Sequence, residues 1–321
     1  SVASRGLGDV YKRQLLYSFN LHAFNDQLNE KQNQNSINLR VDSLNSISTI
    51  NFEYNSFVKL YMDSYLIKDQ KLISKMLAIS KHYFPIFEQK LDKYNLPLEL
   101  KYLSVVESSL NTRAKSPSGA LGLWQFMYPT AKEYGLRVTS YIDERLDPFK
   151  STEAACKYFI KLYDLFGDWN LVLAAYNGGP GYIQRKMIST GHDNYWDLRP
   201  HLRTETRNYV PKFIAITYLM EFHKNYKFPI DTLDITLLNS DTIQIDYQIN
   251  YKTLSKLTCL SEEDISYYNP SFKNNIVPKG SIIVLPKSNI DDYHLNYKEY
   301  KVFTQAVDAV SYTHLTLPTK A

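Results

Sequence analysis

The sequence predicts a mainly α-helical domain followed by a small α+β module. In most segments between residues 51 and 223, apolar residues recur every three or four positions, which is the spacing of one helix face. From residue 243 apolar and polar residues alternate for a short stretch, as they do in a strand. Two helical segments and a second apolar strand follow before residue 286, so this module has the order strand–helix–helix–strand.

The bulk composition is that of an ordinary globular protein. Of 321 residues, 44% are hydrophobic and 22% are charged, which is enough for one large domain or two modest ones. The net charge of +4 comes without a dense Lys/Arg block, which disfavours nucleic acid as a partner. The two cysteines, Cys156 and Cys259, form neither a disulfide framework nor a metal site by their spacing, so we expect no metal and no cofactor.

The beginning of the chain predicts little structure. Residues 15 to about 50 are polar and rich in Asn, Gln and Ser, so we expect a poorly ordered lead-in. The first and last dozen residues resemble translated adapter sequence, and no signal peptide starts at residue 1. We therefore expect the native N-terminus, with any export signal, to be missing.

Two helices are expected after the lead-in. The first covers about residues 54–65, with Phe57, Leu60 and Tyr61 on one face. The second begins near Asp69, and Pro85 should kink it or split it. We expect both helices to pack against the rest of the domain without carrying chemistry.

The next helix, after Pro97, contains the first candidate for catalysis. Leu100, Leu103 and Leu110 mark its apolar face, and Glu107 lies on that same face. Burial would raise the pKa of this carboxyl, which suits a general acid that works near neutral pH. The alternative is a glutamate at the wet border of the apolar stripe.

A loop of small residues, Ser116–Gln125 (SPSGALGLWQ), follows this helix. Gly119 and Gly122 permit positive φ and close backbone approach. Trp124 and Gln125 offer an apolar face and an amide, which together suit a sugar ring with an N-acetyl group. The alternative is a tight turn whose tryptophan belongs to the core.

Three later segments also contain candidate residues. Asp143 and Asp147 could form an acid–base pair, but we favour capping and turn roles because both precede helix or turn starts. Tyr176 and Asn177 end the helix that Asp168 caps, where they either face a cleft or simply terminate the helix. Tyr209 stands at the head of an apolar helical stripe, where its phenol either reaches a cleft or lies in the core.

The segment after residue 224 begins as a linker and then forms the second module. Ser261 and the acidic residues after it predict a capped helix start. The expected elements are a strand at Ile243–Ile249, a helix at Leu254–Leu257, a helix at Ile265–Tyr268 and a strand at Ile282–Leu285.

Taken together, the motifs between about Tyr94 and Phe222 resemble the soluble lytic transglycosylase family, in its membrane-bound lytic murein transglycosylase D subfamily. The sequence departs from the subfamily at Thr112 and Tyr128, where proline is usual. The shared motifs, in the family's order, are Glu107-Ser108, S-x-x-G-A-x-G-L-W-Q at Ser116–Gln125, D-E-R-x-D-P at Asp143–Pro148, A-Y-N at Ala175–Asn177 and E-T-R-x-Y at Glu205–Tyr209.

The resemblance implies a goose-type-lysozyme-like catalytic domain that cleaves the β-1,4 bond between N-acetylmuramic acid and N-acetylglucosamine and leaves 1,6-anhydromuramoyl ends. It implies that Glu107 acts as acid and then as base, and that Tyr209 orients it. Most glycosidases need two carboxylates, whereas a single one suffices if the substrate's own hydroxyl is the nucleophile. The residues implied in substrate binding or support are Ser108, Ser116, Gln125, Tyr176 and Asn177.

The second module resembles a LysM domain, a peptidoglycan- or chitin-binding unit. Asn269-Pro270 and the V-P-K-G-S-I-I-V-L-P strand fit this family well. The usual Gly-Asp-Thr-Leu entry is replaced by Tyr251–Leu254, so the module is degenerate and its glycan binding stays open.

The expected organisation is a lead-in at 1–50, a transglycosylase domain at 51–223, a linker at 224–242, a LysM-like module at 243–290 and a tail at 291–321. The expected partner is the peptidoglycan glycan strand, in the periplasm or at the outer membrane of a Gram-negative bacterium. Membrane association would come from a missing signal or lipid anchor. The alternatives are a lysozyme-like muramidase, which hydrolyses the bond, and a non-catalytic peptidoglycan-binding protein.

Overall fold

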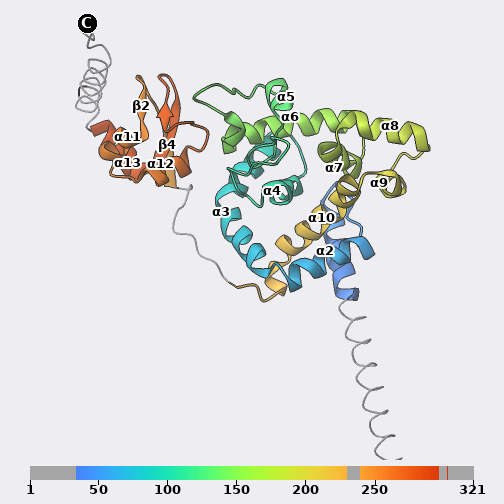
Figure 1. Ribbon diagram of the computed structural model, residues 1–321. Coiled ribbons are helices and arrows are strands. Elements are labelled where there is room, and N and C mark those ends of the chain that lie inside the picture. The colour runs from blue at the N-terminus through green and yellow to red at the C-terminus, as the bar shows by residue number, and fades with distance from the viewer. Residues whose placement is uncertain (1–33, 230–238, 296–301, 303–321) are drawn as a thin grey trace, which may run out of the picture.

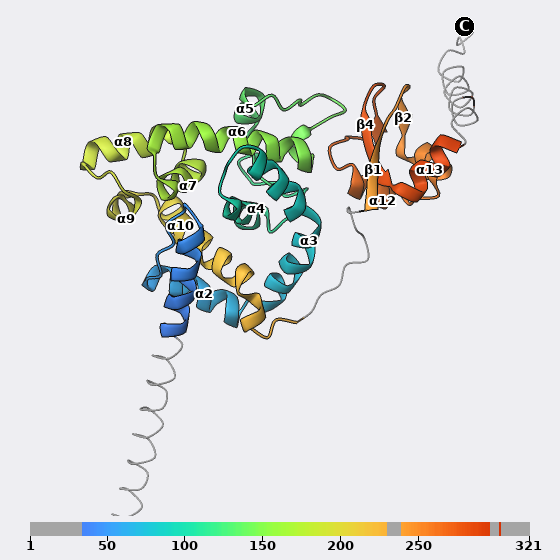
Figure 2. The same cartoon turned by 180° about the vertical axis from the view of Figure 1, so that it is seen from behind.

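A computed structural model describes residues 34–229, 239–295 and 302. It consists of a helical domain and a small α+β module that contacts it (Figure 1). Both views show the segment between α5 and α6 reaching toward the module (Figure 2). The helices of the first domain are α2 (Ser56–Ile67), α3 (Gln70–Lys93), α4 (Lys101–Ser108), α5 (Tyr128–Glu133), α6 (Pro148–Phe166), α7 (Trp169–Gly178), α8 (Pro180–Thr190), α9 (Tyr195–Leu198) and α10 (Thr204–Glu221).

The end of the expected lead-in is ordered. Residues 34–47 are helical, so the expectation of disorder is wrong for them, and residues 1–33 lie outside the described residues. Ile37, Val41 and Leu44 are spaced one helical turn apart and are buried in the core of the domain. Arg40 donates to the hydroxyl of Tyr218 over 2.9 Å. These few apolar positions outweigh the polar average of the segment.

The helix α2 buries a different face from the expected one. Val58, Met62 and Tyr65 are buried, whereas Phe57 and Leu60 are 43% and 67% exposed. Both stripes have helical spacing, and packing against α10 selects between them. The next helix, α3, continues through Pro85 without being split.

The helix α7 is the centre of the domain. Its residues Leu171–Ala175 are completely buried, and it packs against α6, α8 and α10. A helix that is apolar on all sides must be covered on all sides. Asp168 caps its start, as expected, by accepting from the Leu171 amide over 2.7 Å. The C-terminal end of this central helix carries Tyr176 and Asn177.

The second module has its own apolar core and two short antiparallel strand pairs. The expected strand at Ile243–Ile249 is two strands, because the chain leaves the sheet between them. Tyr251 is fully buried, and its hydroxyl donates to the Asn269 carbonyl over 2.7 Å. The elements are β1 (Ser240–Gln244) paired with β4 (Ile282–Pro286), β2 (Ile249–Asn250) paired with β3 (Ile276–Val277), and the helices α11 (Tyr251–Thr258), α12 (Glu262–Tyr268) and α13 (Lys287–Leu295).

Two further sequence predictions concern cysteines and membrane spans. Cys156 is buried and Cys259 is exposed, and both are free thiols. Within the described ranges, the chain has no helix that combines the length and the apolar character needed to cross a bilayer.

Candidate active site

Glu107 lies in the last turn of α4, at the point where the chain reverses. Ser109 and Leu110, directly after the helix, adopt left-handed φ values of 51° and 62°. Two consecutive non-glycine residues rarely adopt this conformation, and their strain ends the helix abruptly. Leu110 is therefore not part of the helix, although its side chain is buried. Glu107 itself is half-buried, so its carboxyl sits at the boundary of the core.

Tyr209 brings α10 to this carboxyl. Its hydroxyl donates to Glu107 Oε1 across 102 positions of the sequence. The ring of Tyr209 is buried, and burial together with the charge of Glu107 raises the pKa of its phenol well above the ordinary value. The phenol therefore stays protonated and remains a hydrogen-bond donor.

The surroundings of Glu107 bring the pKa of its carboxyl near neutral pH. Burial raises the pKa of this carboxyl to about 7, and the Tyr209 hydrogen bond and the positive charge of Lys212 act in the opposite direction. The negative charge of Glu205 adds to the rise. Because this pKa is near neutrality, the carboxyl can donate a proton and also take one back.

Trp124 does not provide the expected sugar platform. Its side chain is completely buried and packs against the rings of Phe87 and Phe159. Its indole N–H donates to Thr152 Oγ1 over 2.9 Å. The sugar-stacking prediction is therefore wrong for this residue, and the alternative, a core tryptophan, is confirmed.

The glycine-containing loop is tied to the residues around Glu107. Ser108 Oγ donates to the Leu123 carbonyl over 3.0 Å, and the Tyr176 hydroxyl donates to the Trp124 carbonyl over 2.7 Å. Neighbours of the carboxyl on α4 and α7 thus hold the loop backbone. These two side chains support the site through the loop.

Gln125 is also committed to the loop. Its backbone is left-handed, with a φ of 48°, and its side-chain nitrogen donates to the carbonyls of Ala114 and Gly122 over 3.0 and 2.9 Å. A primary amide has two N–H donors, and both are used here. A ligand can therefore be bound by this side chain through its oxygen only.

The two remaining candidates lie at different places. Asn177, at the end of α7, accepts from Thr206 Oγ1 over 2.9 Å, and its amide is 3.5 Å from Glu205 Oε1. It therefore joins the start of α10, the helix of Tyr209. Ser116 Oγ accepts from the Ala120 amide over 2.9 Å, so its bond closes the loop on itself.

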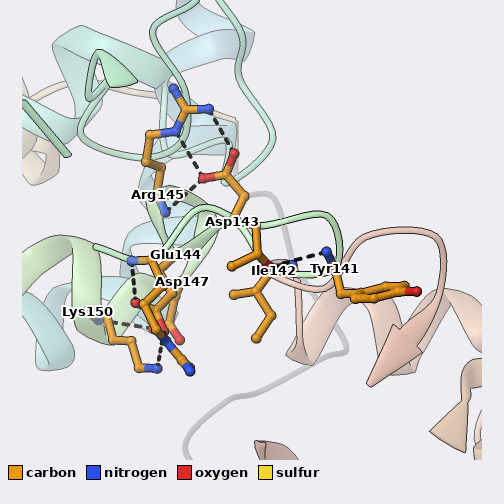
Figure 3. Close-up of polar contacts among 9 residues, drawn as sticks. Tyr141, Ile142, Asp143, Glu144, Arg145, Asp147 and Lys150 are labelled. Carbon is orange, nitrogen blue, oxygen red and sulfur yellow. Dashed lines mark hydrogen bonds and ion pairs between the residues drawn. The ribbon is translucent and has the colours of Figure 1, made fainter. Parts of the chain in front are cut away.

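The acidic segment before α6 has structural contacts, as the capping prediction required (Figure 3). Asp147 caps α6 through the amides of Phe149 and Lys150, at 2.9 and 3.0 Å. Asp143 accepts from the Arg145 amide and forms an ion pair with the same residue. These carboxylates are engaged in the fold, which leaves no acid–base pair in this segment.

Sequence reasoning missed two basic residues, Lys212 and Arg145. Lys212 lies three residues after Tyr209, so both share one face of α10, and this spacing was the available signal. Burial lowers the pKa of Lys212, and the charge of Glu107 opposes this. Arg145 gave no signal in the sequence, because the carbonyls of Gly119 and Phe126 to which it donates are distant along the chain.

Two family models match the chain. Residues 84–198 match the model described as the transglycosylase SLT domain, and residues 239–302 match the model described as the LysM-like domain of lytic transglycosylase MltD. The two matches fall on the helical domain and on the α+β module.

Individual proteins are similar over parts of their length. Membrane-bound lytic murein transglycosylase D of Escherichia coli K12 is 30% identical over 207 residues, which are 62% of this chain and 45% of that protein. Membrane-bound lytic murein transglycosylase F of Pseudoalteromonas translucida is 36% identical over 166 residues, which are 45% of this chain and 34% of that protein. The chain spans about half the length, or less, of the curated relatives it matches.

Among solved structures, the 70 kDa soluble lytic transglycosylase Slt70 from Escherichia coli aligns with a TM-score of 0.39 and 25% identity. The alignment covers 45% of this chain and 25% of that chain.

Proposed function

We propose that this chain, which matches the transglycosylase SLT domain at residues 84–198 and the MltD-type LysM-like domain at residues 239–302, is a peptidoglycan lytic transglycosylase. It would cleave the β-1,4 bond between N-acetylmuramic acid and N-acetylglucosamine. The observation that supports this most is the contact between Tyr209 and Glu107, a carboxyl whose pKa is raised to about 7. The relatives named above as lytic transglycosylases support the same reaction.

In the first step, neutral Glu107 donates its proton to the oxygen of the glycosidic bond. The bond to the anomeric carbon breaks, and the leaving sugar departs with a free hydroxyl. Glu107 is then a carboxylate, and the Tyr209 hydroxyl stabilises and orients it through their hydrogen bond. A pKa near 7 keeps a large fraction of the carboxyl protonated at the start of the cycle.

In the second step, the Glu107 carboxylate takes the proton from the six-hydroxyl of the muramoyl sugar. That oxygen bonds to the anomeric carbon and closes the 1,6-anhydro ring. No water is consumed, and Glu107 is again protonated. Gln125 through its amide oxygen and Asn177 are the side chains we assign to holding the N-acetyl sugar, while Tyr176 lines the site.

The hydrolytic alternative has one supporting observation. Glu205 is close enough for its charge to raise the pKa of Glu107, so a second carboxylate is present near the first. An inverting or retaining glycosidase would use such a residue as base or nucleophile. Glu205 is exposed and lies 3.5 Å from the Asn177 amide, and we favour a role in orienting Asn177.

Digestion of purified cell-wall sacculi tests the proposal. Mass spectrometry of the products should find anhydromuramoyl ends, which are lighter than reducing ends by one water. Glu107→Gln should lower lysis about 1000-fold while the protein stays folded, and Glu205→Gln should retain the same product. Reducing ends would indicate a muramidase. Binding of sacculi without any release would indicate a non-catalytic peptidoglycan-binding protein.

We place the protein in the envelope of a Gram-negative bacterium, because its substrate would be there. A periplasmic or outer-membrane location is supported by the membrane-bound relatives named above. The coding sequence upstream of residue 1 tests this part of the proposal. A cleavable signal or a lipoprotein cysteine is the expected finding.

A further inference from the structure

The α+β module is attached to the helical domain through the segment just before Arg145. Ile142 and Phe272 form an antiparallel bridge between the two parts. On one side of this bridge the Asp143 amide donates to the Ser271 carbonyl over 2.8 Å. On the other side the Lys273 amide donates to the Tyr141 carbonyl, also over 2.8 Å. The segments 141–143 and 271–273 thus pair as a short β-ribbon.

Ile142 belongs to the core of the module. Its side chain is 7% exposed and lies in the module's apolar cluster, together with Phe272, and not in the cluster of the helical domain. In extended backbone, successive side chains point to opposite faces. Asp143 accordingly points away from Ile142 and toward Arg145 (Figure 3).

Arg145 connects this attachment to the loop beside Glu107. Asp143 accepts from Arg145 Nε and Nη2 over 2.9 and 2.8 Å, and both side chains are nearly excluded from solvent. The third nitrogen of the guanidinium, Nη1, donates to the carbonyls of Gly119 and Phe126 over 3.1 and 3.3 Å. These carbonyls flank the stretch that contains Gly122 and Gln125.

The close approach at Gly122 strengthens the connection. A Cβ atom at this position would lie 2.1 Å from the Arg145 carbonyl oxygen, so only glycine allows the two backbones to touch. The module also reaches the other end of the loop, because Arg113 Nη2 donates to the Ser266 carbonyl over 3.0 Å. The module therefore contacts residues 114–126 directly at the Arg113 flank and, at the other flank, through Asp143 and Arg145.

We propose that the α+β module holds the active-site loop, residues 114–126, in its working conformation. Ile142 anchors residues 141–143 in the module. Arg145 is the positioning residue, because it bonds both to Asp143 and to the loop carbonyls of Gly119 and Phe126. Ordering the loop before substrate arrives removes an entropic cost from the binding step. The effect on catalysis rests on the proposed function, whereas the effect on loop order does not.

Hydrogen exchange of the full chain measures the loop directly, at the amides of Gly122 and Phe126, which bond to the carbonyls of Ala114 and Leu121. Ile142→Asp places a charge in the module's core and should undock it. We expect roughly tenfold faster exchange at these amides and at the amides of Asp143 and Lys273, which donate across the β-ribbon. The matched control is Tyr141→Asp, which adds the same charge at a neighbouring side chain that is 42% exposed, and should leave exchange unchanged.

Two more variants separate docking from transmission. Arg145→Gln should speed exchange in the loop while the amides of Asp143 and Lys273 stay protected, since it removes the guanidinium and leaves the β-ribbon in place. The conservative Ile142→Val should restore both wild-type exchange and the rate of sacculus lysis. In Ile142→Asp, we expect lysis to fall about tenfold because the loop must be ordered at each turnover.

Loop exchange equal to wild type in Ile142→Asp would overturn the inference, even if that variant unfolds the module. Equal exchange in Arg145→Gln would overturn the role of the guanidinium. If the wild-type protein fails to lyse sacculi, the proposed function is wrong, but the exchange measurements still decide whether the module orders the loop.

Discussion

Two regions of the helical domain remove a carboxylate from water, and the two carboxylates respond in opposite ways. At the end of α4, Glu107 accepts a hydrogen bond from the neutral phenol of Tyr209, and its pKa is raised to about 7. In the segment before α6, the Glu144 side chain is only 4% exposed, yet its pKa is lowered. Burial opposes ionisation in both places.

The difference lies in the partners. Glu144 accepts from the backbone amide and the guanidinium of Arg137 and from the ammonium of Lys150, all within 2.7 Å. These charge-assisted bonds outweigh the loss of water. Glu107 has fewer compensating contacts, so its carboxyl keeps its proton up to neutral pH, where it can both donate and accept one. A buried carboxylate is suited to proton transfer only where its partners do not stabilise the anion fully.

The largest expected effect is on activity. Glu107→Gln should lower sacculus lysis about 1000-fold, which is within the range for loss of a general acid and base. Glu144→Gln, an equally conservative change at the other carboxylate, should retain lysis within about threefold when assayed well below its melting temperature. Equal losses in the two variants would contradict the distinction between the regions.

Tyr209→Phe should have the next largest effect. Loss of the hydroxyl removes the bond that lowers the pKa of Glu107, so this pKa should rise and the alkaline limb of the pH–rate profile should move to higher pH. We expect the maximal rate to fall about tenfold because the carboxyl loses its orientation. Tyr176→Phe is the matched control, since its hydroxyl bonds to the Trp124 carbonyl and its loss should leave the pH limb in place.

Stability should depend on pH oppositely for the two carboxylates. Glu107 binds its proton more tightly in the folded state than in the unfolded state, so stability falls as pH rises from about 4.5 to about 7. Glu107→Gln should remove this dependence. At pH 8 the free energy of unfolding of this variant should be about 2 kcal/mol higher than that of wild type. Chemical denaturation at pH 4 and pH 8 measures the change, and a variant that is less stable at both pH values would refute it.

The smallest effect is expected at Glu144. Its pKa is lowered in the folded state, so its contribution is present above the ordinary pKa of 4.5 and is lost as pH falls below that value. Glu144→Gln should cost about 1 kcal/mol at pH 7, because the partners Arg137 and Lys150 are 60% and 48% exposed and water screens them. Below pH 4 the difference from wild type should shrink.

Local features were predictable from the sequence because neighbouring residues produce them. Asp168 and Ser261 cap helices where their side chains predicted caps, since such a bond spans only two or three residues. The second module contains the expected strand, two helices and final strand in that order, but the first expected strand is two strands, and β3 and α13 were not expected. For Glu107 and Tyr209, spacing alone left both readings open, and their predicted roles rest on the shared motifs.

Other features depended on partners distant in the sequence. Trp124 could have faced a sugar or the core, and the rings of Phe87 and Phe159 determine that it is core. The apolar face of α2 was assigned wrongly because two stripes compete and only α10 selects one. The role of Ile142 was invisible, because its packing partners come from the second module.

The sequence by itself determined which residues could do the chemistry, where the caps at Asp168 and Ser261 lie, and that a second module follows the first. Only the tertiary structure decided that the phenol of Tyr209 meets Glu107, that the Gln125 amide nitrogen is used by its own loop, and that the module reaches that loop through Arg145. The physical reason is the distance along the sequence over which each interaction acts. Caps and periodicity act over one or two turns of chain, whereas a pKa and a docked surface depend on groups that folding brings together from distant segments.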